Sequence, residues 1–327
     1  MKESKRRSTT LLWVVATACC AAVYPATARA QAIQRSVALD PPLEIGTKVN
    51  SIGTWSGGAL LVLEGELAGA PVIRIYDSSG TEVQRIDLQV PGAEGLDVLH
   101  RRIARSSSGY VAFAGKAYGY GDRAGGFLAI VSPDGTNQRV VRTEPYFAYA
   151  ITFAPDGTIW TAGLNKDVEE GSDAGNASYF VVQRFDTQGR QLGGAVPRNT
   201  FPGPYAPVDT SFFVTSKDRV GWVAPMAHRY MEFSLDGKLL ASYPFTFSYS
   251  DLNGGALCGD ETLWMSLRVR PDPKSPGPQQ SALASFDRAT GTWHQGATRP
   301  FTYLYGCSGN TLITTTTWSN LNWLAEK

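Results

Sequence analysis

Short apolar runs separated by turn residues follow one another along most of the chain. Examples are ALLVLE after Gly58, YVAFAG after Gly109 and TIWTAG after Gly157, which are rich in aliphatic, β-branched and aromatic residues. Runs of this kind between turn residues are typical of β-hairpins. No stretch of useful length has the 3.6-residue periodicity of an amphipathic helix. The pattern predicts an all-β chain.

Two series of turns recur at intervals of roughly fifty residues. The first series closes the runs IRIYDSSG, LAIVSPDG, VQRFDTQG, MEFSLDG and ASFDRATG, with glycines at Gly80, Gly135, Gly189, Gly237 and Gly291. The second series consists of Gly58, Gly109, Gly157, Asp218, Asp260 and Gly309. Each unit therefore supplies four strands, a to d, with the second series at the a–b turns and the first at the c–d turns. Four-stranded repeats of this length are typical of β-propeller blades.

The sixth unit lacks a fourth strand, because the chain ends shortly after LYGCSGN, TLITTTT and NLNWLAEK. The segment around Arg35–Leu39, which precedes the first strand a near Val49–Trp55, is predicted to supply the missing outer strand. A ring closed in this way leaves no exposed edge at its junction. The sequence thus predicts a six-bladed β-propeller with four-stranded blades, whose N-terminal strand completes the last blade.

Two segments resemble a known repeat. FAPDGTIWTAG (Phe153–Gly163) and FSLDGKLLASY (Phe233–Tyr243) are similar to the NHL-type repeat of secreted bacterial six-bladed propellers. The resemblance implies an architecture over residues 49–324 and no particular activity, since propellers host unrelated functions.

The first thirty residues have the pattern of an export signal. Lys2, Lys5, Arg6 and Arg7 precede an apolar run at Leu11–Tyr24, and Ala28-Arg29-Ala30 is a small-residue cleavage signal. Residues 1–30 are predicted to be a signal peptide cleaved after Ala30, with an uncleaved anchor as the alternative. Residues 31–327 then form a single propeller domain in the periplasm or outside the cell, with no second apolar run of membrane length.

The charge balance argues against nucleic-acid binding. The chain has 30 Lys and Arg against 29 Asp and Glu, and loss of residues 1–30 leaves 25 against 28. Phosphate contacts need a clustered cationic face, which this balance does not suggest. High Gly and Pro content with 18% charged residues also argues against a coiled coil or a disordered chain. We expect a monomer that does not bind nucleic acid and whose mature chain does not span a membrane.

The b–c and d–a loops share one face of the ring, here called the long-loop face. Three of its loops are long, at Lys116–Gly126, Asn165–Ser178 and Val269–Ser281. Long loops on a rigid framework often carry function, so a site is expected on this face at the central channel. The residues predicted to lie near the channel mouth, as ligand-binding candidates, are Asn50, Arg101, Arg102, Tyr149, Asp209, Asp251 and Tyr303.

Asp209 and Asp251 come from neighbouring blades, and with Asn50 they offer oxygen ligands of the kind that Ca²⁺ and Mg²⁺ prefer. Enzymes of the gluconolactonase type are similar in using such a channel site. The alternative is that both acids are solvated or pair with Arg101 and Arg102. The sequence predicts no required cofactor, with Ca²⁺ or Mg²⁺ bound at Asp209 and Asp251 as the alternative.

Covalent and zinc chemistry have little support. There is no G-x-S-x-G motif, and His100, His228 and His294 belong to different blades.

Cys258 and Cys307 lie at matching places just before the a–b turns of adjacent blades. We predict a disulfide between them, which requires a Cα separation below about 7 Å, and a catalytic thiol is the alternative.

Aromatic residues are the remaining signal on the long-loop face. Those that map to it are Tyr118, Tyr120, Tyr146, Phe147, Tyr149, Tyr205, Tyr249 and Tyr303. Rigid aromatic groups make good contact surfaces for a protein, peptide, glycan or small-molecule ligand. Trp160, Trp222 and Trp264 recur at one position of strand b and are predicted to pack between blades. The sequence favours a binding or scaffold module, with a divalent-metal-dependent hydrolase or lyase as the alternative.

Overall fold

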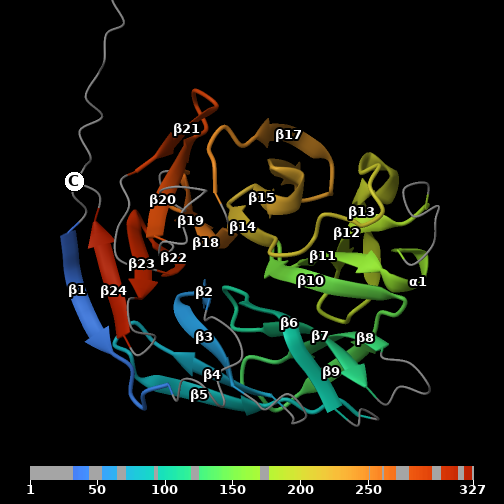
Figure 1. Cartoon of the computed structure of the whole chain (residues 1–327). Helices are drawn as coiled ribbons and strands as arrows, with labels where there is room; N and C mark the ends of the chain where they lie inside the picture. Colours follow the sequence, from blue (N-terminus) through green and yellow to red (C-terminus); the bar gives the residue numbers. More distant parts are fainter. Residues whose placement is uncertain are drawn as a thin grey trace, which may run out of the picture.

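Six four-stranded antiparallel sheets stand around a central axis in the computed structural model of the chain (Figure 1). The residues that the structure describes are 32–43, 54–64, 71–91, 95–118, 125–169, 177–249, 251–259, 261–269, 280–296, 303–315 and 320–325. The predicted signal peptide, Asn50 and the turn at Asp260 lie outside them. The chain is a six-bladed β-propeller, which confirms the architecture predicted from the two turn series.

Each blade runs from an innermost strand a to an outermost strand d. Blade 1 consists of β2 (Thr54–Ser56), β3 (Ala59–Glu64), β4 (Val72–Tyr76) and β5 (Glu82–Asp87). Blade 2 consists of β6 (Gly95–Arg105), β7 (Val111–Tyr118), β8 (Gly125–Val131) and β9 (Gln138–Arg142). Blade 3 consists of β10 (Tyr146–Phe153), β11 (Ile159–Asn165), β12 (Phe180–Phe185) and β13 (Gln191–Pro197).

The second half of the ring repeats this order. Blade 4 consists of β14 (Phe212–Ser216), β15 (Arg219–Ala224), β16 (Arg229–Ser234) and β17 (Leu239–Pro244). Blade 5 consists of β18 (Asp251–Leu257), β19 (Leu263–Val269), β20 (Gln280–Asp287) and β21 (Thr292–Gln295). Blade 6 consists of β22 (Tyr303–Ser308), β23 (Thr311–Thr315), β24 (Asn320–Ala325) and β1 (Ala32–Ala38).

The ring closes through β1, which lies antiparallel to β24 as the outer strand of blade 6 (Figure 1, blue beside red). The hydroxyl of Ser36 donates a hydrogen bond of 2.8 Å to Asn322 Oδ1. The guanidinium carbon of Arg35 lies 4.7 Å from the ring centroid of Trp323. The closure therefore joins the two ends of the described chain by a strand ladder and by side-chain contacts.

The segment after β1 is held against blade 1 by a buried arginine. Arg74 on β4 is 5% exposed, and its Nη1 lies 2.7 Å from Glu64 Oε1 while its Nε lies 2.5 Å from Glu82 Oε2. Arg74 Nη2 and the Tyr76 hydroxyl both donate to the carbonyl oxygen of Pro41. Because a buried guanidinium needs several acceptors, this arrangement fixes the segment that follows the closing strand.

The c–d turns have a common geometry that explains the first glycine series. Gly80, Gly135, Gly189, Gly237 and Gly291 all have positive φ angles. At Gly80 a Cβ atom would lie 2.3 Å from the carbonyl oxygen of Ala38, so only glycine allows the closing segment to approach this turn. The a–b turns lie at the same ends of the strands as the c–d turns, and the face that these turns share is called the turn face below.

Packing between blades uses the recurring tryptophans. Trp160 and Trp222 are fully buried and Trp264 is 8% exposed. Trp160 lies 5.9 Å from the ring of Phe233, which belongs to the next blade. A buried aromatic side chain stabilises the fold by about 2 to 3 kcal/mol, so these positions confirm the predicted packing role.

Helical structure in the described residues is limited to single turns, α1 (Lys166–Glu169), η2 (Arg198–Thr200) and η3 (Pro225–Ala227). Among the residues that the structure describes, no helix has both the length and the apolar character needed to cross a bilayer.

Candidate functional site

The residues predicted at the channel mouth are described to different extents. Asn50 lies outside the described residues. Arg101 and Arg102 are on β6, but their side chains are not described. Tyr149 is the extra residue of a bulge in β10, between Ala148 and Ala150, and it is half-buried. Bulges turn a side chain away from the regular alternation of a strand, so this one sets the direction of Tyr149.

Asp209 and Asp251 each bind the backbone that follows them. Asp209 is exposed just before β14, and its Oδ1 accepts the amide of Thr210 at 2.9 Å. Asp251 begins β18, and its Oδ1 accepts the amide of Leu252 at 2.8 Å. Within the described ranges, no group of three or more His, Cys, Asp or Glu side chains is placed to hold a metal ion. The metal site at these acids stays a prediction.

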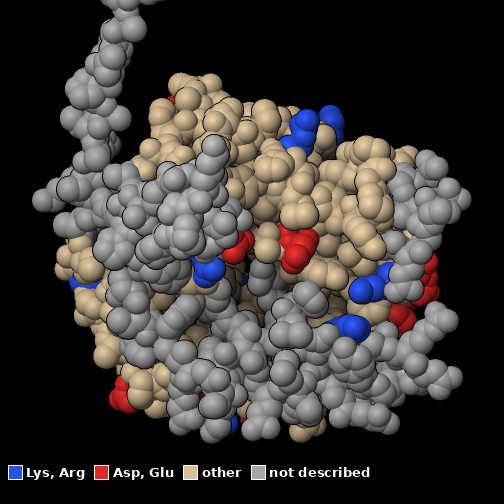
Figure 2. All heavy atoms as spheres, in the orientation of Figure 1, with Lys and Arg blue, Asp and Glu red and all other residues tan. Residues whose placement is uncertain are grey.

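Asp251 instead belongs to a cluster with an arginine and a tyrosine. Arg268 on β19 lies opposite Asp251 in the strand register, and its Nη2 donates a 2.9 Å hydrogen bond to the hydroxyl of Tyr303. Tyr303 is 5% exposed, and burial raises its pKa while the charge of Arg268 acts in the opposite direction. Blades 5 and 6 are thus connected by charged and polar groups at the start of their innermost strands. Figure 2, which views the ring along its axis, shows acidic and basic side chains close together near the centre.

A proline-rich loop between blades 3 and 4 presents an exposed tyrosine. Tyr205 is 66% exposed at the tip of this loop, residues 201–209. The side chain of Arg198, which is fully buried, donates to the carbonyl oxygens of Phe201 and Gly203, the second at 2.8 Å. Since backbone carbonyls satisfy the buried guanidinium, the loop has a defined shape around Arg198.

A second exposed apolar side chain lies on the neighbouring b–c connection of blade 4. Met226 on η3 is 64% exposed. Ala227, the next residue, packs on the same apolar cluster as Ala206 beside Tyr205. The Tyr205 loop and η3 therefore rest on one common support, and their exposed side chains belong to the same part of the long-loop face.

The loop after β17 adds aromatic groups to this region. Phe245 and Phe247 stack with ring centroids 5.3 Å apart, and both contact Trp293 of blade 5. The Tyr249 hydroxyl donates to the carbonyl oxygen of Pro225 at 2.7 Å, and burial raises its pKa to about 12. Nδ1 of His228 lies 3.2 Å from the same hydroxyl, so this nitrogen carries the hydrogen that Tyr249 accepts.

Other aromatic residues predicted for this face are packing residues. Tyr146 is 5% exposed, and its hydroxyl donates to the carbonyl oxygen of Val181 at 3.0 Å. Phe147 is 8% exposed. Tyr120 lies outside the described residues, as does the side chain of Tyr118. Tyr146 and Phe147 are consecutive residues of β10 and point to opposite sides of the sheet, and both are buried because neighbouring blades pack against both sides of a blade.

A cavity of about 650 Å³ occupies the channel toward the turn face. It is lined by the last residues of the six innermost strands and by their a–b turns, and among the described residues of the lining Arg105, Lys217 and Glu261 are charged. From the sequence, only tight turns were expected on this face.

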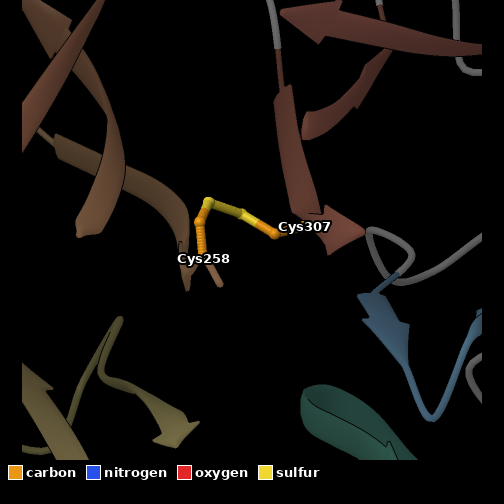
Figure 3. The surroundings of a disulfide bond; sticks show 2 residues. All are labelled: Cys258 and Cys307. Carbon is orange, nitrogen blue, oxygen red and sulfur yellow. A yellow bond between two sulfur atoms is a disulfide. The ribbon is translucent and has the colours of Figure 1, made fainter. Parts of the chain in front are cut away.

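A disulfide forms part of the cavity wall. Cys258 and Cys307 are bonded, with their Cα atoms 5.4 Å apart, and they join blade 5 to blade 6 (Figure 3). Matching positions on adjacent innermost strands bring the two residues within the distance that a bond requires.

Blades 4 and 5 are connected on the turn face by an ion network. Glu232 on β16 is 1% exposed, and its carboxylate lies 3.0 Å from Nε of Arg288 and 3.4 Å from Nη1 of Arg219. The Tyr230 hydroxyl donates to it at 3.0 Å. Arg288 also pairs with Glu261 at 2.8 Å. Burial raises the pKa of Glu232, against the opposing effects of Tyr230 and Arg219.

Sequence reasoning missed Arg198, Arg268 and the cavity residues. The segment RNTFPGPYAPVD, with three prolines and a glycine beside one arginine, was the available signal for the Tyr205 loop. For Arg105 and Lys217 the signal was their position at a–b turns, which approach the axis in every blade.

No protein-family model and no functionally curated protein matches this sequence. Several solved structures have a similar fold. A candidate exported protein of Bacteroides fragilis is similar over 90% of this chain and 94% of its own, with a TM-score of 0.56 and 10% identity. A luciferin-regenerating enzyme is similar over 89% and 94%, with a TM-score of 0.51 and 11% identity. The xyloglucanase of Xanthomonas campestris is similar over 86% of this chain and 43% of its own, with a TM-score of 0.53 and 12% identity. At these identities the likeness concerns the fold alone, and the six blades are counted from the six four-stranded sheets of the ring itself.

Proposed function

We propose that this propeller is an exported binding module that recognises a protein or peptide partner. Its contact surface lies on the long-loop face, at the channel mouth and over the adjoining loops of blade 4. The observation that carries the proposal is Tyr205, which is 66% exposed on a loop held by the fully buried Arg198.

An ordered loop with an exposed aromatic tip suits binding. Ordering a loop on association costs affinity, and a loop already shaped by Arg198 avoids most of that cost. Tyrosine is enriched among residues that dominate interface energies, because its ring offers a large apolar area and its hydroxyl a polar contact.

The surroundings of Tyr205 favour a protein or peptide over a sugar. Met226 is 64% exposed nearby, and methionine is enriched in protein interfaces. Phe247 and Tyr249 add half-buried aromatic area beside it. Arg268 and Asp251 supply charged groups toward the channel, where they would surround an apolar centre as a polar rim.

The export part of the proposal rests on the signal pattern of residues 1–30 and is supported by the disulfide. Disulfides persist in the periplasm and outside the cell and are rare in the cytosol. Amino-terminal sequencing of protein recovered from the periplasm or medium should begin at Gln31. Recovery of full-length protein in the membrane fraction would favour the anchor alternative.

The binding proposal is tested with two matched double variants. Tyr205→Ser with Met226→Ser removes the exposed apolar groups of the long-loop face. Leu239→Ser with Leu240→Ser removes two residues, each 50% exposed, from the outer strand β17. Each immobilised protein is exposed to the periplasmic and secreted fractions of the producing cells, and retained proteins are quantified by mass spectrometry. A protein retained by the unmodified chain and by the β17 variant, and lost with the Tyr205 variant, is the expected result. Equal retention by all three proteins would contradict the proposed surface, and loss on glycosidase treatment would point to a glycan ligand.

A further inference from the structure

The cavity on the turn face is partly open to solvent and lies on the opposite side of the ring from the proposed protein-binding surface. Its volume of about 650 Å³ lies within the range of pockets that hold small molecules. Because all six blades contribute to its wall, the cavity is part of the rigid centre of the propeller and does not depend on one loop.

Two cations in the cavity wall have no described acidic partner. Arg105 ends β6 in blade 2 and Lys217 lies in the a–b turn of blade 4. The described ion pairs include neither of them. Glu261, the acid that the structure describes in the wall, is paired with Arg288 at 2.8 Å. The described part of the wall therefore presents positive charge.

Arg105 is fixed in place and keeps unused donors. Its Nη1 donates to the carbonyl oxygen of Gly57 at 3.1 Å, and its backbone exchanges two hydrogen bonds with the Ser56 hydroxyl, of 2.7 and 3.0 Å. Nε is buried and has no hydrogen-bond partner among the described residues. A guanidinium carries five N–H donors, and the described hydrogen bonds use one of them, so Arg105 keeps donors for an anion.

The rest of the polar wall consists of hydroxyl groups. Those from blades 1 to 4 are Thr54, Ser56, Ser106, Ser107, Thr152, Thr215 and Ser216. The side chains of Ser56, Ser106, Thr152 and Ser216 already make hydrogen bonds to described residues, whereas those of Thr54, Ser107 and Thr215 have no hydrogen bond to another described residue and are the ones left for a ligand. A hydroxyl group both donates and accepts hydrogen bonds, which matches the alternating donors and acceptors of a polyhydroxylated ligand.

The wall is also held rigid on the side of blades 5 and 6. The disulfide between Cys258 and Cys307 fixes one part of it, and the pairing of Glu261 with Arg288 fixes another. A site whose groups are fixed before binding loses less affinity to ordering.

We propose that this cavity binds a sugar acid, a small polyhydroxylated carboxylate. Arg105 and Lys217 hold the carboxylate from different sides of the wall, and the serine and threonine hydroxyls bind the ligand's hydroxyl groups. The carboxylate accounts for the two cations without a described acidic partner, and the hydroxyl groups account for the polar, uncharged remainder of the lining. The site is independent of the partner proposed for the long-loop face.

The test is isothermal titration calorimetry of the purified, oxidised protein with three probes: sodium galacturonate, galactose and inorganic phosphate. Galacturonate should bind at least about tenfold more tightly than galactose, because the two differ in the carboxylate. Lys217→Gln and Arg105→Gln should each weaken galacturonate binding about tenfold. Lys217 lies in an exposed turn, so its variant remains informative if Arg105→Gln does not fold.

Three further variants test whether galacturonate binding depends on this cavity. Lys238→Gln removes a cation of the same face that does not line the cavity, and Tyr205→Ser alters the opposite face, so both should leave binding unchanged. Glu261→Gln removes the described carboxylate of the wall and should strengthen binding. Equal affinity for phosphate and galacturonate would overturn the sugar-acid assignment. Absence of galacturonate binding up to about 10 mM, or equal loss with Lys238→Gln, would overturn the site.

Discussion

The two faces of this ring differ in how their charged groups are paired. On the long-loop face, the described part of the channel mouth pairs Arg268 with the Tyr303 hydroxyl and places it opposite Asp251, and exposed apolar groups lie beyond them. On the turn face, acids are held inside turns and in the network around Glu232, while Arg105 and Lys217 line an open cavity.

Strand direction therefore gives the two faces of the ring separate tasks. Tight turns with side-chain hydrogen bonds keep the ends of the strands in place, so the turn face stabilises the ring and encloses a small space. The loops of the opposite face are longer and present side chains such as Tyr205 outward, so that face is suited to a large partner. The predictions below alter one face at a time.

The disulfide is the largest single contribution expected on the turn face. Cys258→Ser with Cys307→Ser opens a covalent loop with a sequence separation of 49 residues, which should lower the free energy of unfolding by about 4 kcal/mol. Urea unfolding of oxidised and variant protein measures this value. Ser308→Ala, at an exposed position beside Cys307, is the control and should change it by less than about 0.5 kcal/mol. If the double variant lost less than about 1 kcal/mol of unfolding free energy, the disulfide would not be a main source of stability for the ring.

The ion network between blades 4 and 5 should have the next largest effect. Arg288→Met removes the nearer cation from Glu232, a carboxylate that is 1% exposed, and should cost about 3 kcal/mol. Without Arg288, the buried carboxylate of Glu232 keeps only the longer pairing with Arg219 among the described cations, so Glu232→Gln in the same chain should restore most of the loss. Urea unfolding of the single and double variants gives the coupling energy. Additive effects of the two changes would contradict the network.

Much of this architecture could be predicted from the sequence, because turns and alternation are local properties. The glycines at Gly80 and Gly135 need positive φ angles, and this requirement appears directly in the sequence. The candidate site was harder to predict from the sequence, because it depends on the direction in which side chains point. Tyr146 and Tyr303 lie on the face predicted for them, yet both side chains are buried. The role of Arg198 depends on backbone carbonyl groups, which every residue has, so their position around Arg198 could not be predicted from residue types.

The pH dependence of stability should separate the turn aspartates from the network. Hydroxyl groups of Ser79, Ser132 and Ser234 hold the pKa values of Asp77, Asp134 and Asp236 below the ordinary 3.8. Their stabilising contribution is present above about pH 3.8 and is lost as the pH falls through the lowered values. The pKa of Glu232 is raised above 4.5, so its effect has the opposite sign, and stability falls as the pH rises above 4.5.

Urea unfolding between about pH 3 and pH 7 checks both signs. Asp77→Asn with Asp134→Asn should reduce the loss of unfolding free energy that occurs as the pH falls below about 3.8. Glu232→Gln should remove the decline in unfolding free energy above pH 4.5. If the aspartate variant lost as much unfolding free energy at low pH as the unmodified protein, the turn hydrogen bonds would not stabilise the fold in the way described.

The exposed groups of the long-loop face should matter little for folding. Tyr205→Ser with Met226→Ser should change the free energy of unfolding by less than about 0.5 kcal/mol, because both side chains are mostly in solvent already. Thermal and urea unfolding measure this change. A loss above about 1 kcal/mol would mean that these residues stabilise the loops, and the reduced binding expected of this variant would then have a structural cause.

Arg198→Met changes a buried side chain that supports the Tyr205 loop, in contrast to the exposed side chains of the double variant. It removes the buried guanidinium that satisfies the carbonyl groups of Phe201 and Gly203. It should therefore cost stability and reduce partner binding even though Tyr205 is still present.

The smallest expected effect concerns metal ions at the acids of the channel mouth. Asp209 and Asp251 each accept the backbone amide of the next residue, at 2.9 and 2.8 Å, so one oxygen of each carboxylate is already engaged. An ion held at about a hundred times its dissociation constant would stabilise the protein by about 2.7 kcal/mol and raise the unfolding midpoint visibly. We expect no such rise with Ca²⁺, Mg²⁺ or Zn²⁺, and no fall with EDTA. We also expect the same midpoint for Asp209→Asn, because its carboxylate is exposed and its amide contact can be kept by asparagine.

A rise with one ion that disappears in Asp209→Asn would instead establish a metal site on the long-loop face. The partner-binding proposal would then have to give way to a screen for metal-dependent hydrolase or lyase activity.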